Sequence, residues 1–333
     1  MLFGKKIDLL TIGDTAVDAF IRIKEASVNC DVDRHNCKLC MNFADKIPYE
    51  SVEIVPAVGN SANAAVAAAK LGISTGLVSD LGNDDYGRVC ASVLDHQGVS
   101  TKHVSVHKNS VTNYHYVLWY EDERTILVKH EEYTRKFPTA VAPQWVYLSS
   151  LGSNSLDYHT EIIEWLKKHP EIKLVFQPGT FQMKTGVEKL KYLYERSEIF
   201  CVNVEEAQKI LNVPNGEPLA LLTGIKALGP KIVLVTDGPK GAYMYDGVNA
   251  WFMPIYPDPK PPLERTGCGD AFASTFMSAL MLGKSPEEAL LWAPINPMWV
   301  VQHVGAQKGL LTRAELEDFL AKAPTDYKPR KIN

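Results

Sequence analysis

The residues with the clearest chemical potential form a short glycine-rich segment at residues 264–270, which reads ERTGCGD. Apolar residues then recur at helical spacing at Phe272, Phe276 and Leu280, which predicts a helix that begins within the segment. Small residues at a helix start leave its first backbone N–H groups unobstructed, and these groups attract an anion such as phosphate. Asp270 beside such a site is placed to accept a proton from an attacking hydroxyl. The alternative is a glycine-rich turn in which Asp270 only stabilises the helix start.

Two familiar phosphate-binding motifs do not describe this segment. In a Walker A loop the glycines are followed by Lys and then Ser or Thr, and no such pair follows Gly269. The dinucleotide fingerprint comes directly after a first strand and spaces its glycines more widely. The segment therefore indicates phosphate handling of another type.

Four motifs together resemble the signatures of the ribokinase-like (PfkB) carbohydrate kinase family, and they occur in the family's order. TGCGD at residues 266–270 is similar to the C-terminal signature, which usually reads Asp-Thr-x-Gly-Ala-Gly-Asp. GNSANA at residues 59–64, with GNDDYG at 82–87, is similar to the N-terminal signature. NVEE at residues 203–206 is similar to Asn-x-x-Glu, and TDGPKG at 236–241 to Thr-x-Gly-x-x-Gly. The resemblance covers nearly the whole chain.

The resemblance implies a role for each matched position. Gly267, Cys268 and Gly269 would supply an anion hole through their backbone N–H groups, and Asp270 would activate the acceptor hydroxyl. The positions expected near ATP are Asn203, Thr236, Gly238, Gly241 and Asn296. The positions expected near substrate hydroxyls are Asp18, Gly59 and Asn63. The positions expected near metal ions are Glu206, for Mg²⁺ through water, and Glu264 and Thr266, for a monovalent cation such as K⁺.

Simpler interpretations exist for two of these roles. Asn203 and Glu206 also have the spacing of a helix N-cap and its reciprocating acid, and both roles can hold together. Asp18 could be a turn acid after the first strand. In favour of the substrate role, carboxylate and amide groups can each grip neighbouring hydroxyls.

The sequence departs from the family pattern at three places. Glu264 and Arg265 replace the usual Asp-Thr, which puts activation by K⁺ in question. Cys268 replaces alanine, and because helix N-termini lower the pKa of a thiol, we expect it to be sensitive to alkylation. Val58 and Gly59 replace paired glycines, which reshapes that side of the substrate pocket.

Around these motifs, strand-like and helix-like runs alternate along most of the chain. The predicted strands are residues 6–13, 73–79, 145–149, 172–177, 198–202 and 231–236. The predicted helices are residues 61–71, 84–97, 156–169 and 187–196, with a last helix opened by a capping box at Thr312. This alternation predicts a three-layer α/β/α fold with a mostly parallel central sheet.

Two stretches without convincing helices, residues 16–58 and 106–132, predict a small antiparallel sheet that forms a lid. The main domain then comprises residues 1–15, 59–105 and 133–333. The aromatic residues of the predicted lid are Phe43, Tyr114, Tyr116, Trp119 and Tyr120. They could stack on a nucleobase, or pack against the core or a second subunit.

Composition narrows the class of protein. A net charge of −4 and a pI near 6.2 argue against a nucleic-acid partner. No signal peptide or membrane-length apolar run is apparent, and six cysteines in 333 residues do not indicate a disulfide framework, so we expect a reduced, cytoplasmic protein. Cys30, Cys37 and Cys40 with His35 could close a zinc site, although buried or interface cysteines are the favoured interpretation.

The sequence thus predicts an ATP- and Mg²⁺-dependent kinase that phosphorylates a hydroxyl of an unphosphorylated sugar. The alternative is a nucleoside acceptor, because ribose presents the same hydroxyls. A phosphosugar would need a cationic clamp, for which Arg124 and Lys129 are the candidates. A non-catalytic ligand sensor and a Rossmann dehydrogenase are the rival classes. An apolar lid face would favour a homodimer formed through the lids.

Overall fold

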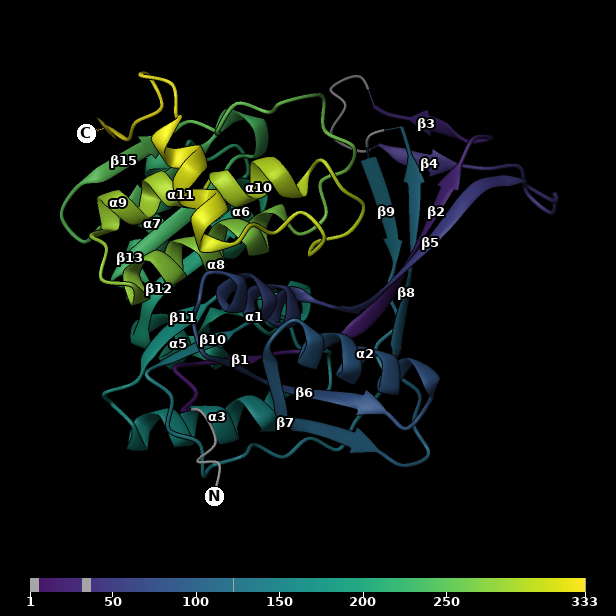
Figure 1. The fold of residues 1–333 in the computed structure, drawn as a ribbon, viewed down its shortest axis with the longest axis horizontal. Helices are drawn as coiled ribbons and strands as arrows, with labels where there is room; N and C mark the ends of the chain where they lie inside the picture. The colour runs from purple at the N-terminus through teal and green to yellow at the C-terminus, as the bar shows by residue number, and fades with distance from the viewer. Residues whose placement is uncertain (1–5, 32–36, 122, 333) are drawn as a thin grey trace.

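A ten-stranded sheet forms the centre of the protein in a computed structural model that describes residues 6–31, 37–121 and 123–332 (Figure 1). Its strands, in spatial order, are β16 (Arg330–Ile332), β15 (Ala250–Met253), β14 (Ala242–Tyr245), β13 (Ile232–Thr236), β12 (Ser197–Asn203), β11 (Lys173–Phe176), β10 (Trp145–Leu148), β1 (Leu9–Ile12), β6 (Thr75–Gly82) and β7 (Val99–His107). The strands from β7 to β13 are parallel, and those from β13 to β16 pair antiparallel. β1 and β10 are buried along their whole length, as expected for parallel strands covered on both faces.

Helices cover both faces of this sheet and complete three layers, which confirms the predicted fold class. One layer contains α1 (Asn60–Lys70), α2 (Asp85–His96), α8 (Cys268–Met281), α9 (Pro286–Trp292), α10 (Ile295–Val300) and α11 (Arg313–Ala321). The other contains α3 (Leu156–Lys168), α5 (Val187–Arg196), α6 (Val204–Leu211) and α7 (Pro218–Ala227), with the short α4 (Thr180–Thr185) before α5. No helix in the described part of the chain is both long and apolar enough to cross a membrane.

A separate four-stranded sheet, here called the small sheet, stands at one side of the main body (Figure 1). Its strands, in spatial order, are β5 (Tyr49–Val58), β2 (Ala16–Ile23), β8 (Asn113–Tyr120) and β9 (Glu123–Leu127). β2 runs antiparallel to β5 but parallel to β8, so the prediction of a purely antiparallel sheet is wrong. The chain between β2 and β8 passes through α1, β6, α2 and β7, and such a long crossover is what a parallel pair requires.

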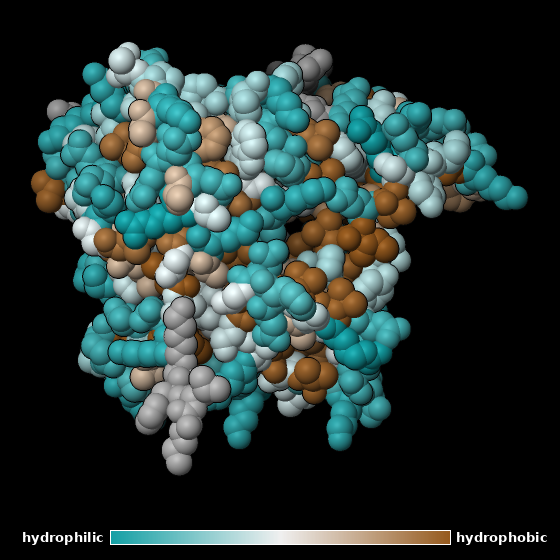
Figure 2. Space-filling model, in the orientation of Figure 1, coloured by the Kyte–Doolittle hydropathy of each residue, from teal (hydrophilic) through white to brown (hydrophobic). Residues whose placement is uncertain are grey.

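The register of the small sheet gives it two distinct faces. Asp18 lies opposite His115, and Arg22 and Arg124 lie on either side of Trp119, so these five residues share what we call the inner face. The other face, called the outer face, carries half-exposed apolar side chains from all four strands: Ile21, Val52, Ile54, Tyr116, Leu118 and Leu127. Figure 2 shows hydrophobic side chains gathered over the part of the small sheet beside α2.

The inner face is turned toward the main body. A Cβ atom at Gly305 would lie 3.2 Å from a methyl group of Val55, which is on this face. The Glu53 carboxylate, on the same face, lies 3.7 Å from the Lys308 ammonium group. The small sheet therefore touches the loop that follows α10.

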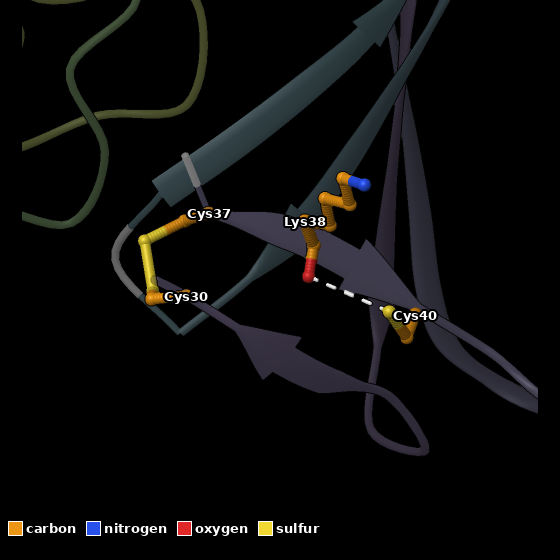
Figure 3. Close-up of a disulfide and its surroundings, with 4 residues drawn as sticks. All are labelled: Cys30, Cys37, Lys38 and Cys40. Atoms are coloured by element: carbon orange, nitrogen blue, oxygen red, sulfur yellow. Dashed lines mark hydrogen bonds between the residues drawn. A yellow bond between two sulfur atoms is a disulfide. The ribbon is translucent and has the colours of Figure 1, made fainter. Parts of the chain in front are cut away.

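A disulfide joins Cys30 and Cys37 at one end of the hairpin formed by β3 (Ser27–Asn29) and β4 (Lys38–Cys40) (Figure 3). Their Cα atoms are 4.0 Å apart because the two strands pair, a proximity that spacing along the sequence does not reveal. The expectation that no cysteines form disulfides is therefore wrong for this pair. The Cys40 thiol donates to the Lys38 carbonyl instead of joining a zinc site, and His35 lies outside the described residues. Among the described residues, no three His, Cys, Asp or Glu side chains are grouped to hold a metal.

Candidate active site

Asp270 lies in the first turn of α8, a helix whose side chains are buried from this residue to Ala279. The helix is capped by Gly267, which has φ of 79°. A Cβ at this position would lie 2.2 Å from the Cβ of Ala306, so both the backbone angle and the space require glycine. The glycine thus lets the first N–H groups of α8 stand free of side chains beside Asp270.

Three side-chain amides hold the carboxylate of Asp270. Asn60 and Asn63, both in the first turn of α1, donate to its two oxygens at 2.7 and 2.8 Å. Gln177, just beyond β11, donates to it at 3.0 Å. The N-termini of α1 and α8 therefore meet at Asp270, and both helix dipoles favour negative charge there. The structure brings the predicted pair Asn63 and Asp270 together and adds two residues that the sequence analysis did not single out.

Two further groups orient those amides. Gln307 donates to the side-chain oxygen of Asn63 at 3.0 Å and to the carbonyl of Ala57 at 2.7 Å. The Tyr147 hydroxyl donates to the side-chain oxygen of Gln177. With both amide oxygens occupied, the NH₂ groups of Asn63 and Gln177 are left to point at the carboxylate. Asp270 is thereby held in one orientation before any substrate arrives.

The environment of Asp270 makes it a stronger base than an ordinary aspartate. Burial raises the pKa of its carboxyl group, and this outweighs the opposing hydrogen bonds from Asn63, Asn60 and Gln177 and the charge of Arg124. Only 5% of the residue is exposed. A raised proton affinity suits a group that must accept a proton from a hydroxyl.

The second cluster of predicted residues lies at the junction of β1 and the small sheet. Asp18 and the ring nitrogen Nδ1 of His115 are 3.3 Å apart, and the Nε2 atom of His115 is buried without a partner. Gly59 has φ of 118°, and a Cβ there would lie 2.4 Å from the carbonyl oxygen of Asp14. This close approach joins the loop before α1 to the loop after β1. The His115 ring also touches that of His130, and the centroid of the latter is 5.5 Å from that of Phe181.

The two predicted nucleotide motifs lie side by side, because Asn203 at the end of β12 pairs with Thr236 at the end of β13. Asn203 and Glu206 form a capping box with bonds of 2.8 and 2.9 Å, so the structural interpretation of this pair is correct. Burial raises the pKa of the Glu206 carboxyl group. Gly238 has φ of 51° and open space around it, whereas a side chain at Gly241 would collide with the carbonyl of Met253.

Comparison with known proteins decides the family. Residues 28–313 match the pfkB family of carbohydrate kinases. This chain is a pfkB-family kinase. It is 28% identical to the ribokinase of Bacillus subtilis over 288 residues, which cover 81% of this chain and 89% of that enzyme. It is 22% identical to a nucleoside kinase of Methanothermobacter thermautotrophicus over 310 residues, or 91% of this chain and 92% of that one.

The fold of this pfkB kinase agrees with that assignment. It aligns with the structure of Arabidopsis thaliana ribokinase complexed with ribose and ATP at a TM-score of 0.77 and 22% identity, covering 95% of this chain and 99% of that one. The pfkB kinase therefore transfers a phosphoryl group from ATP to a hydroxyl group.

Two sequence-based expectations about the phosphate end of this pfkB kinase require correction. Burial raises the pKa of the Cys268 thiol to about 12, and the Glu264 carboxylate adds to this, so the expected activation of the thiol is wrong. Asn296 is fully buried, donates to Thr275 and accepts from the backbone of Leu311. Its amide joins helices within the core, so this position does not support a contact with the nucleotide.

The candidate cation residues behave differently from one another. The two oxygens of Glu264 accept backbone N–H bonds from Thr266 at 2.5 Å and Gly305 at 2.9 Å, so this carboxylate ties two loops together. The hydroxyl of Thr266 is buried without a partner. A hard cation such as K⁺ could therefore be bound only by the Thr266 hydroxyl oxygen and by the lone pairs of Glu264 that do not accept these two backbone hydrogen bonds.

The functional residues that the sequence analysis missed share a signal that could have found them. Gln177 is the last residue of a predicted strand and so lies at the carboxyl edge of the sheet, which is where ligands bind in open α/β folds. Asn60 lies inside the GNSANA motif. His115 and Gln307 carry no such signal, because only the folded chain brings them to Asp18 and Asn63.

Proposed function

We propose that this pfkB kinase phosphorylates a hydroxyl of an unphosphorylated sugar. The observation that carries the proposal is the buried Asp270 carboxylate, which three amides hold at the meeting point of two helix N-termini. Asp18 on the inner face and the amides of α1 supply several polar groups for neighbouring hydroxyls. A small polyol needs such a polar site, which the chain concentrates between the small sheet and α8.

In this proposal each group has a defined part in the transfer. Asp18, Gly59 and Asn63 orient the acceptor, and Asp270 accepts the proton of its reacting hydroxyl. The backbone N–H groups of residues 267–269 stabilise the charge on the transferred group. The loop at residues 236–241, with Asn203, holds the nucleotide.

Metal ions enter the proposal through the donors available. Glu206 offers one carboxylate near the phosphate end, and Mg²⁺ is commonly held by one or two carboxylates with water and substrate phosphates, so the residue fits an indirect contact. The ion would neutralise charge on the polyphosphate. For K⁺, the candidates remain Glu264 and Thr266.

A nucleoside remains the second candidate acceptor. The favouring observation is the row of rings from His115 through His130 to Phe181 beside Asp18, which could contact a base. The tyrosines first considered for this contact, Tyr114 and Tyr116, share the outer face and cannot stack on a ligand held at Asp18.

Assembly and location follow as further parts of the proposal. The apolar outer face of the small sheet is suited to a homodimer in which each small sheet, acting as a lid, packs on its partner. Light scattering of the wild type and of Ile54→Glu tests this, because loss of the dimer is expected only if that face is the interface. A cytoplasmic location fits an enzyme that consumes ATP.

The test of the proposed function is a screen of ADP release with Mg-ATP over sugars and nucleosides, each with and without K⁺. Activity is expected with at least one free sugar and with loss of that activity in Asp270→Asn. Turnover confined to nucleosides would favour the second candidate, and turnover confined to phosphosugars would refute both.

A further inference from the structure

Arg124, on the inner face of the small sheet, forms no ion pair with any described carboxylate. It belongs to β9 and lies opposite Trp119 of β8. Its side-chain Nε atom is buried and has no hydrogen-bond partner, and no ion pair joins it to any carboxylate of the described residues. A buried Nε–H group without a hydrogen-bond partner is unfavourable, so this atom indicates that a ligand supplies the missing acceptor.

The position of Arg124 indicates which charge is missing. Burial dominates the pKa of both Asp270 and Cys268, and the positive charge of Arg124 is one of the contributions that oppose it in each case. Both of these residues stand in the first turn of α8. Arg124 also shares the inner face with Asp18 and Trp119, and this face is turned toward the main body, so the register of the small sheet places the guanidinium group on the same side as the start of this helix.

The other cations considered for this side of the molecule are already paired. Lys129 is largely exposed and forms an ion pair of 2.6 Å with Glu131. Arg22, also on the inner face, lies 4.6 Å from the ring centre of Trp119 and 3.3 Å from the Glu50 carboxylate. Of these three side chains, only Arg124 has no anionic partner among the described residues.

We propose that Arg124 is a catalytic residue that binds the phosphoryl group during its transfer. In this step the acceptor oxygen bonds to the γ-phosphorus, the bond from this phosphorus to the bridging oxygen of ADP breaks, and the acceptor's proton passes to Asp270. Charge on the transferred group spreads over its outer oxygens. The forked N–H donors of Arg124 bind these oxygens from one side while the N-terminus of α8 binds them from the other.

This assignment gives the small sheet a second task. Because Arg124 is carried by β9, its guanidinium group would reach the anion site only while the inner face lies against the main body, as Val55 of β5 lies against Gly305. Phosphoryl transfer would thus be completed only in the closed enzyme, which limits transfer to water. The proposal depends on the kinase activity alone and holds for a sugar or a nucleoside acceptor.

The test compares Arg124→Gln with the wild type by titration calorimetry, using Mg-ADP alone and Mg-ADP with aluminium fluoride, which imitates the transferred group. We expect equal affinity for Mg-ADP and a loss of roughly 10- to 100-fold for the fluoride complex, the range of a lost hydrogen bond to a charged group. The catalytic constant with the acceptor found by the screen should fall at least as far at unchanged acceptor KM. Lys129→Gln is the matched control and should behave as wild type in every measurement.

Three results would overturn the proposal. An equal loss of affinity for Mg-ADP alone would make Arg124 a nucleotide ligand, and a raised acceptor KM at unchanged turnover would make it an acceptor ligand. Wild-type values throughout would leave it no role in the transfer. If Arg124→Gln fails to fold, Arg124→Lys replaces it, since it keeps the charge but loses the fork. It should then show an intermediate loss with the fluoride complex, and undiminished affinity would refute the proposal.

Discussion

Replacing Asp270 by asparagine tests the central assignment, because it removes the base while keeping the size of the side chain. In the wild type, Oδ1 accepts from Asn60 and Gln177, and Oδ2 accepts from Asn63. In Asp270→Asn an NH₂ group at the Oδ1 position would lose the two hydrogen bonds from Asn60 and Gln177, whereas at the Oδ2 position it would lose only the one from Asn63. We therefore expect the NH₂ group at the Oδ2 position. It then faces the NH₂ group of Asn63. Asn63 cannot turn its oxygen toward it without giving up the bond from Gln307.

The expected effects on rate and binding differ in size. Loss of a positioned general base lowers turnover by about 10²- to 10⁴-fold. The displaced donor pair at Asn63 should raise the acceptor KM, since one hydrogen bond to a charged group is worth about 1.5–3 kcal/mol. Affinity for Mg-ADP should stay unchanged, because Asn203 and residues 236–241 are untouched.

The assay is acceptor-dependent ADP release across pH, with nucleotide binding measured separately. Because burial raises the pKa of Asp270, the wild-type enzyme keeps this carboxyl group protonated to a higher pH than an ordinary aspartate would be. Its kcat/KM should therefore rise with pH along an acid limb that lies above the usual aspartate range, and this limb should vanish in Asp270→Asn. Unchanged turnover in the variant, or the same acid limb, would refute the reasoning.

Other predictions concern the surroundings of the site. Asp14→Ala should lower the free energy of unfolding by about 1.5–3 kcal/mol, measured in urea at neutral pH, because it removes the 2.8 Å partner of the buried Arg135 and leaves it only Asp80, at 3.5 Å. Burial raises the pKa of the Asp14 carboxyl group, but His130 and Arg135 lower it by more, so the net shift is downward. The stabilisation that Asp14 gives the folded protein should therefore be lost only as the pH falls through this lowered pKa. Iodoacetamide near pH 8 should label Cys40 before Cys268, whose thiol has a pKa of about 12, and the reverse order in mass spectrometry would contradict this. Gln307→Leu should raise the acceptor KM while leaving Mg-ADP affinity at the wild-type value, and an unchanged KM would mean that Asn63 needs no support.

Much of the catalytic core was predictable because its residues are tied to local backbone geometry. Gly267 and Asp270 are three residues apart, and the rules of helix starts alone place the acid beside free N–H groups. The same holds for Asn203 and Glu206, whose capping box is a feature of one turn. Such patterns can be recognised in the sequence because the contacts they predict join residues only a few positions apart.

The remainder depends on contacts between distant segments, which leave no local pattern. His115 meets Asp18 only through the parallel pairing of β8 with β2, and that pairing contradicted the antiparallel sheet inferred from alternation. The lowered thiol pKa expected at Cys268 failed for a related reason. A helix N-terminus favours a thiolate, but burial and the nearby Glu264 carboxylate, neither visible in the spacing, outweigh it.

The parallel pairing of β2 with β8 also constrains the order in which the chain can fold. During synthesis α1, β6, α2 and β7 are made before β8, so until β8 is made the only neighbouring strand of the small sheet available to β2 is β5. Contacts between distant segments form late and slowly. We therefore expect hydrogen exchange during refolding to protect the β2–β5 pair before the β2–β8 pair. Until the second pair forms, a nascent chain would expose the edge of β2 to proteases and to other unfolded chains.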